Sequence, residues 1–102
     1  MKRYAVRVTA LANKQIQELM EYLKENTESQ ELADQQFSKV ITAIASLEYF
    51  PERGFRLKRR YDNSYVHRLI VSPYLIFYRI LLSEVHVLSV LHQSSNTQKY
   101  YH

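Results

Sequence analysis

The sequence predicts an α+β fold in which an N-terminal strand and a two-helix hairpin pack on a mostly antiparallel β-sheet. Residues 3–8 alternate between apolar and polar side chains, as a half-buried strand does. Residues 9–47 contain two stretches in which apolar side chains recur at helical spacing. Residues 66–91 contain three β-favouring runs whose connections are too short for anything but antiparallel neighbours.

The length of 102 residues fits a single domain over residues 1–102 with one core, and the 46% apolar content agrees. No stretch approaches the ~18 to 20 uninterrupted apolar residues of a membrane span, and the start lacks the apolar run of a signal peptide. We therefore expect a cytoplasmic protein with no membrane partner. Because the chain has no cysteine, a disulfide framework, a thiolate zinc site and a cysteine nucleophile are excluded.

The first strand has Tyr4, Val6 and Val8 on one face, and Arg3 and Arg7 on its other face suit the edge of a sheet. This pattern predicts a short strand that opens the fold.

Two helices are expected next. Thr9 offers an N-cap for a first helix that runs to about Glu25, and Thr27 or Ser29 is the N-cap of a second. Their apolar stripes predict an antiparallel hairpin that covers one face of the sheet. The stripes comprise Ala12, Ile16, Leu19, Met20 and Leu23 in the first helix, and Ala33, Phe37, Val40, Ile41, Ile44 and Leu47 in the second.

The helices end at Phe50, because Pro51 disfavours helical backbone in the residue before it, and the only glycine follows at Gly54. Residues 55–59 predict either an additional strand or an irregular basic lead-in. Residues 66–72, 74–82 and 85–91 then form the meander. The tail from about residue 93 is polar, and we expect it to be mobile.

Within the meander both faces of the middle run are largely apolar, and Arg68 and Arg79 are the exceptions. An arginine among strand residues has a carboxylate partner, a rim position or a working face to serve. Because the helices cover one face of the sheet, we expect the less covered face to be the working surface. If both arginines serve a partner, their guanidinium groups should reach a common open surface rather than internal salt bridges.

Charge is concentrated in the second half of the chain. Residues 1–50 carry six Lys/Arg and seven Asp/Glu, a net charge of −1, whereas residues 51–102 carry eight and three, a net charge of +5. This asymmetry indicates an anionic partner, or else only a soluble basic surface. The basic cluster contains Arg53, Arg56, Lys58, Arg59 and Arg60, with Tyr61, Tyr65, Tyr74, Tyr78, Tyr100 and Tyr101 interleaved nearby.

Cations neutralise phosphates and aromatic rings stack on bases, so this combination could hold RNA. The alternative is that the tyrosines belong to the core and the basic run is a solvated loop.

The sequence offers little for other chemistry. One glycine leaves no phosphate-binding loop, and we expect no cofactor. We expect no metal either: His86 and His92 would share a face of one strand, yet six residues at ~3.3 Å place them roughly 20 Å apart. A metal-independent nuclease would need a base, an acid and cations, for which His92, Arg68 and Arg79 are the candidates. A histidine at a strand end is more often an ordinary surface or capping residue.

The order of elements, the turn at residues 51–54, and the segments Arg68-Leu-Ile-Val, Tyr74-Leu-Ile-Phe-Tyr-Arg79 and Val90-Leu-His-Gln93 resemble the RelE/ParE superfamily of type II toxin–antitoxin toxins. The resemblance runs from about Tyr4 to Gln93. It implies a β-α-α-β-meander toxin, associated with growth inhibition and plasmid stabilisation. It also implies a hetero-oligomer with a cognate antitoxin, whose binding segment is usually acidic.

The superfamily divides by target. RelE-like and YoeB-like members cut mRNA on the ribosome, whereas ParE-like members bind DNA gyrase. Leu75 stands where a nuclease member would have an arginine, and Gln93-Ser-Ser replaces a basic run, while Tyr78-Arg79 looks ParE-like. Against this, His92 and the terminal Lys99-Tyr-Tyr-His102 preserve groups that a YoeB-like mechanism could use.

Three hypotheses follow from the resemblance. The first is a ParE-like toxin that binds gyrase and has no chemistry of its own. The second is a ribosome-dependent mRNA endonuclease with Arg68, Arg79 and His92 near the scissile phosphate. The third is a detoxified relic that binds the antitoxin only. The residues expected to bind the target or the antitoxin are Arg56, Lys58, Arg59, Arg60, Arg68 and Arg79.

Overall fold

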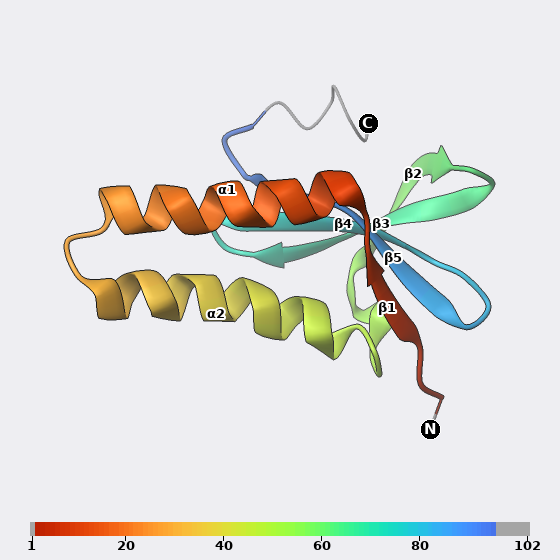
Figure 1. The fold of residues 1–102 in the computed structure, drawn as a ribbon. Helices are drawn as coiled ribbons and strands as arrows, with labels where there is room; N and C mark the ends of the chain where they lie inside the picture. Colours follow the sequence, from red (N-terminus) through yellow and green to blue (C-terminus); the bar gives the residue numbers. More distant parts are fainter. Residues whose placement is uncertain (1, 96–102) are drawn as a thin grey trace.

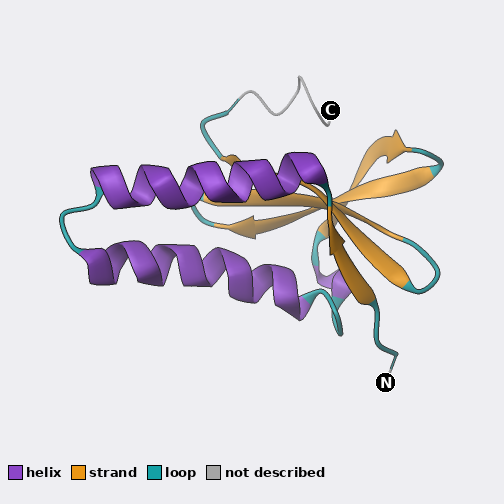
Figure 2. Cartoon of the chain, viewed as in Figure 1, coloured by secondary structure: helices purple, strands orange, loops and turns teal. Residues whose placement is uncertain are grey.

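The computed structural model describes residues 2–95, which form two helices packed on a five-stranded sheet (Figures 1 and 2). The order of the strands is β1-β5-β4-β3-β2; β1 runs parallel to β5, and the other neighbours are antiparallel. This confirms the predicted α+β fold. The elements are β1 (Ala5–Val8), α1 (Ala10–Asn26), α2 (Gln30–Ser46), the 3-10 turn η1 (Pro51–Arg53), β2 (Phe55–Tyr61), β3 (Ser64–Val71), β4 (Tyr74–Ile80) and β5 (Glu84–His92).

Side-chain caps set the beginnings of the helices, as predicted. The hydroxyl of Thr9 accepts a hydrogen bond from the backbone N–H of Ala12 at 3.2 Å and begins α1. Ser29 caps α2 in the same way. Thr27, the other candidate for this cap, instead ends α1, because its N–H donates to the carbonyl of Leu23.

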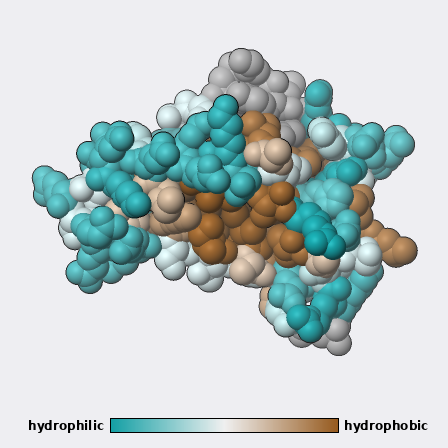
Figure 3. Space-filling view, in the orientation of Figure 1, coloured by the Kyte–Doolittle hydropathy of each residue, from teal (hydrophilic) through white to brown (hydrophobic). Residues whose placement is uncertain are grey.

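The helices lie side by side over one face of the sheet (Figure 1), and the main core lies between the two layers. Two stripe predictions were wrong: Met20 and Ile41 are 38% and 42% exposed, and Ala43 is buried on α2 instead. Met20 and Ile41 lie at the outer seam between the helices, where they line a hollow with Phe37. The space-filling view shows apolar surface in this region (Figure 3).

The opposite face of the sheet carries a second, smaller core. Val66, Phe77 and Leu88 are buried there, and Leu57, Leu75 and Leu91 pack against them. Both described helices contribute to the first core and neither contributes to this one. The middle strand β4 is therefore covered by helices on one face and only by neighbouring side chains on the other.

The segment after η1 is a strand, which decides between the two predictions for residues 55–59. Its pairing with β3 is nevertheless irregular, because the register shifts between Arg56 and Arg60. Asp62 and Asn63 make the tight turn to β3 with φ values of 52° and 68°, a left-handed backbone that Asp and Asn tolerate. The tip of the β2–β3 hairpin projects clear of the helices (Figures 1 and 2).

The predicted mobile tail lies largely outside the described residues. Gln93 donates its backbone N–H to the carbonyl of Pro73 at 2.8 Å, which ties the chain after β5 to the β3–β4 turn. Within residues 2–95, no helix combines the length and the apolarity that crossing a membrane requires.

Candidate functional site

The face of the sheet that the helices leave uncovered, called the open face below, gathers apolar side chains around Arg68. Cα partners on neighbouring strands share a face, so the pairs Phe55–Arg68 and Arg68–Phe77 form one row across the sheet. Ile70, Leu75 and Leu91 form the next row. Phe55 is 65% exposed and Ile70 57% exposed, which is unusual for large apolar side chains on a sheet.

Arg68 lies among these apolar side chains and forms no ion pair with a described residue. Its guanidinium carbon is 5.4 Å from the centre of the Phe55 ring, within the range of a cation–π contact. Its Nε is buried without a hydrogen-bond partner, and none of the ion pairs among residues 2–95 involves Arg68. Its positive charge therefore remains available to a group outside the described chain.

Arg79 shares the open face but is used internally. Its side chain is only 13% exposed, and one nitrogen lies 3.3 Å from Nδ1 of His86. A second nitrogen lies 3.9 Å from a carboxylate oxygen of Asp62, and the guanidinium sits over the Tyr61 ring at 5.4 Å. Arg79 thus joins β4 to β5 and to the β2–β3 turn.

This set of contacts continues toward β1. Nε2 of His86 lies 2.9 Å from one carboxylate oxygen of Glu84, and Nε of Arg7 donates to the other at 3.2 Å. The hydrogen bonds from His86 and then Arg7 hold the pKa of Glu84 below its usual value. We call Arg7, Asp62, Arg79, Glu84 and His86 the Arg79 cluster; it is an architectural network that ties the strands together.

His92 does not join the two arginines. It pairs with Tyr74 on the helix-covered face, where the two rings meet edge-on at 5.5 Å, and its Nδ1 lies 2.7 Å from the Ser94 hydroxyl. The expectation that His86 and His92 share a face was therefore wrong. Phe77 pairs with Ser89 but Tyr78 with Val87, so β5 carries one extra residue between the two histidines, and this bulge reverses the alternation.

The remaining cations predicted to bind lie on the β2–β3 hairpin and form a surface that we call the basic arm: Arg56, Lys58, Arg59 and Arg60. All four are exposed. The guanidinium carbons of Arg56 and Arg60 lie 4.4 and 4.8 Å from the centre of the Tyr65 ring, a side chain of β3. The interleaved tyrosines divide accordingly: Tyr61 and Tyr65 are exposed and contact arginines, Tyr74 and Tyr78 are buried, and Tyr100 and Tyr101 lie outside the described residues.

The base of the basic arm is fixed by a contact of Tyr78 that the sequence pattern did not predict. The hydroxyl of Tyr78 donates to the carbonyl of Pro51 at 2.5 Å and accepts from the N–H of Gly54 at 3.1 Å. Burial raises the pKa of Tyr78, so the hydroxyl keeps its proton. His67 stacks on the Tyr78 ring at 5.4 Å, and burial lowers the pKa of His67, which leaves this ring neutral near pH 7. The available signal was the phenol of Tyr78, which stands between Phe77 and Arg79 in a strand expected to be covered on both faces.

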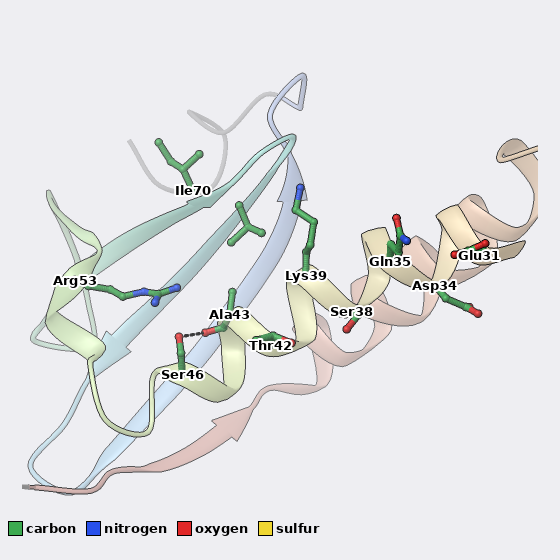
Figure 4. A pocket seen from close by; sticks show the side chains of 11 residues that line it. Glu31, Asp34, Gln35, Ser38, Lys39, Thr42, Ala43, Ser46, Arg53 and Ile70 are labelled. Atoms are coloured by element: carbon green, nitrogen blue, oxygen red, sulfur yellow. Dashed lines mark hydrogen bonds between the residues drawn. The ribbon is translucent and has the colours of Figure 1, made fainter. Parts of the chain in front are cut away.

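A second hollow runs along α2 beside the end of β3 (Figure 4). Glu31 and Asp34 line one end, Arg53 lines the other, and Lys39 lies between them, with Ile70 on the sheet side. Lys39 reaches the carbonyl of Ser72 at 3.3 Å. This groove carries both charge signs, and nothing in it resembles a catalytic arrangement. Across residues 2–95, no three side chains of the metal-ligating types gather at one point.

Over residues 6–97 the sequence matches the family model described as the ParE toxin of the type II toxin–antitoxin system parDE. The chain belongs to this ParE toxin family. The match spans nearly the whole chain, and it confirms the resemblance to the RelE/ParE superfamily and its ParE-like members. No curated protein is significantly similar to the sequence of this ParE-family toxin.

Solved structures share its fold. A chain of the chromosomal ParDE system from P. aeruginosa has a TM-score of 0.68 and 14% identity, over 88% of this chain and 96% of that one. A chain of the archaeal RelE–RelB complex from Pyrococcus horikoshii OT3 has a TM-score of 0.62 and 14% identity, over 90% of this chain and 97% of that one. A chain of the RelBE2 toxin–antitoxin complex from Mycobacterium tuberculosis has a TM-score of 0.56 and 24% identity, over 88% of this chain and 98% of that one. Because all three identities are below 25%, these comparisons show a shared fold and no more.

Proposed function

We propose that this ParE-family toxin inhibits growth in the cytoplasm by binding DNA gyrase and that a cognate antitoxin neutralises it. The match to the ParE family over residues 6–97 carries this proposal. The similarity in fold to a chain of a ParDE system supports it. In this account the whole chain acts as one binding domain and catalyses no reaction.

The open face is the surface proposed to bind the target. Protein interfaces combine an apolar centre with aromatic residues and arginine and exclude most other charges from that centre. Phe55, Ile70 and Leu75 supply the apolar part, and Arg68 supplies a cation that no described residue neutralises. A carboxylate from the partner would find a partly desolvated guanidinium there, which strengthens the charge-assisted bond.

The antitoxin is the second proposed partner. The RelE–RelB and RelBE2 structures that share this fold are toxin–antitoxin complexes. An acidic antitoxin segment would suit the second half of this chain, whose net charge is +5. Arg68 and the basic arm are the residues that we propose for such contacts.

The alternative is a ribosome-dependent mRNA endonuclease of the RelE or YoeB kind. The similarity in fold to the RelE–RelB complex is the observation that supports this alternative. That mechanism would use Arg68, Arg79 and His92 around one phosphate. His92 lies on the face of the sheet opposite the arginines, and Arg79 is engaged within its cluster, so the arrangement gives this alternative less support. A relic that binds only the antitoxin is the third possibility.

Two assays on the purified chain separate these proposals. We expect inhibition of supercoiling by gyrase, with intact mRNA on ribosomes programmed with an A-site codon. Clean A-site cuts with unaffected gyrase would instead support the endonuclease. If neither assay responds, and expression without an antitoxin leaves growth unchanged, the chain would be the antitoxin-binding relic.

A further inference from the structure

We infer that the basic arm binds the sugar–phosphate backbone of duplex DNA, and that it thereby holds the toxin on the DNA beside gyrase. The second part rests on the proposed function, because it assumes that the toxin binds gyrase and that the bound duplex is the DNA on which gyrase acts. The first part concerns the arm alone and stands on its charge, exposure and shape.

The charge of the arm is not cancelled within the described chain. Residues 55–68 contain the four cations of the arm, Arg68 of the open face and one Asp, a net charge of +4, which equals the formal net charge of the whole protein. The single acid, Asp62, faces Arg79 at 3.9 Å. None of the ion pairs among residues 2–95 involves the four cations of the arm. Lys58 and Arg59 lie where the register of β2 shifts, and such a bulge re-aims side chains.

Two cations of the arm, Arg56 and Arg60, are partly ordered before any partner binds. Arg56 and Arg60 both stack on Tyr65, and Arg60 also donates to the carbonyl of Asn63 at 3.1 Å. Because a guanidinium stacked on a ring has already lost part of its rotamer freedom, less entropy is lost when it binds a phosphate. Two of the four cations of the arm are therefore held in place before a phosphate binds.

The shape of the arm favours a duplex over an acidic peptide. The hairpin tip is a two-stranded ribbon that projects clear of the helices (Figures 1 and 2), and six of the seven residues of β2 are exposed. A two-stranded ribbon fits the major groove of B-DNA, which is about 12 Å wide. An acidic peptide would need only one face of such a ribbon, whereas a groove uses both.

The test measures binding of the full chain to a fluorescent 30-base-pair duplex of arbitrary sequence, without gyrase, by anisotropy at several salt concentrations. Four phosphate contacts predict that the affinity falls about 150-fold between 50 and 200 mM salt. The variant Lys58→Gln/Arg59→Gln should lose two contacts, so the same change in salt should lower its affinity only about 12-fold. Lys14→Gln/Lys24→Gln removes the same charge from exposed positions on α1 and should keep the wild-type dependence.

Two results would overturn the inference. One is equal salt dependence of the two double variants. The other is binding of an acidic peptide or an RNA hairpin at least tenfold more tightly than the duplex.

The supercoiling assay separates this inference from the proposed function. If wild type inhibits gyrase but does not bind the duplex, the arm inference fails and the proposed function stands. If wild type binds the duplex through the arm but leaves gyrase active, the proposed function fails and the role of the arm beside gyrase fails with it. Inhibition that weakens in the arm variant but not in the α1 variant supports both.

Discussion

Replacing Tyr78 with phenylalanine tests the contact that positions the base of the basic arm. The ring is fully buried, and its hydroxyl satisfies the carbonyl of Pro51 and the N–H of Gly54. Tyr78→Phe keeps the ring and its stacking on His67 but leaves both backbone groups without their partner. A buried polar group left unsatisfied costs about 1 to 3 kcal/mol, and the N–H of Gly54 is only partly buried, so the free energy of unfolding should fall by about 2 to 4 kcal/mol.

The measurement is equilibrium unfolding in urea, with circular dichroism and tyrosine fluorescence as two probes of the transition. With a slope of about 2 kcal/mol/M, the midpoint should fall by about 1 to 2 M while the slope stays unchanged. Tyr65→Phe is the matched control, because this exposed ring keeps its stacking on arginine and should change stability by less than about 0.5 kcal/mol. If Tyr78→Phe and Tyr65→Phe shift the midpoint equally, the hydroxyl does not fix the arm.

Three further predictions concern neighbouring features. Gly54→Ala should lower the free energy of unfolding by about 1 to 3 kcal/mol, because an added Cβ would collide with the Tyr78 hydroxyl. The loss should be smaller in a Tyr78→Phe background, and additive losses in urea unfolding would refute this coupling. Arg79→Ala should lower the free energy of unfolding by about 1 to 2 kcal/mol, because it removes the centre of the Arg79 cluster; an unchanged midpoint would make the cluster incidental. The lowered pKa of Glu84 contributes stability that is present above its unfolded pKa and is lost as the pH falls through its folded pKa. Glu84→Gln should therefore flatten the fall in the free energy of unfolding at acidic pH, whereas the control Glu25→Gln should not.

Features with local causes could be predicted from the sequence. The caps at Thr9 and Ser29 depend on a hydroxyl and the next turn of helix, and short connections force the meander to be antiparallel. Family membership followed from the order of such features.

Features that depend on distant partners could not be predicted. The bulge in β5 is set by its pairing with β4, and it moved His92 to the face opposite Arg79. The parallel pairing of β1 with β5 joins the first and last strands along the sequence, and no local pattern specifies it. Periodicity alone therefore assigned one histidine to the wrong face.

The two arginines of the open face show the same limit. They were indistinguishable in the sequence as lone cations in apolar strands. The structure separates them, because Arg79 meets Asp62 and His86 from a turn and a neighbouring strand, whereas Arg68 lies against the ring of Phe55. Only the three-dimensional arrangement could supply those neighbours.

The most direct test of the central claim compares wild type with Arg68→Ala in a supercoiling assay with purified gyrase. An arginine at the centre of an interface contributes about 1.4 kcal/mol or more, so the variant should need at least about tenfold more protein for the same inhibition. Its urea midpoint should stay close to that of wild type, since Arg68 makes no ion pair among the described residues. Equal inhibition by both proteins would contradict the assignment of the open face, and the absence of inhibition by wild type would contradict the proposed binding of gyrase.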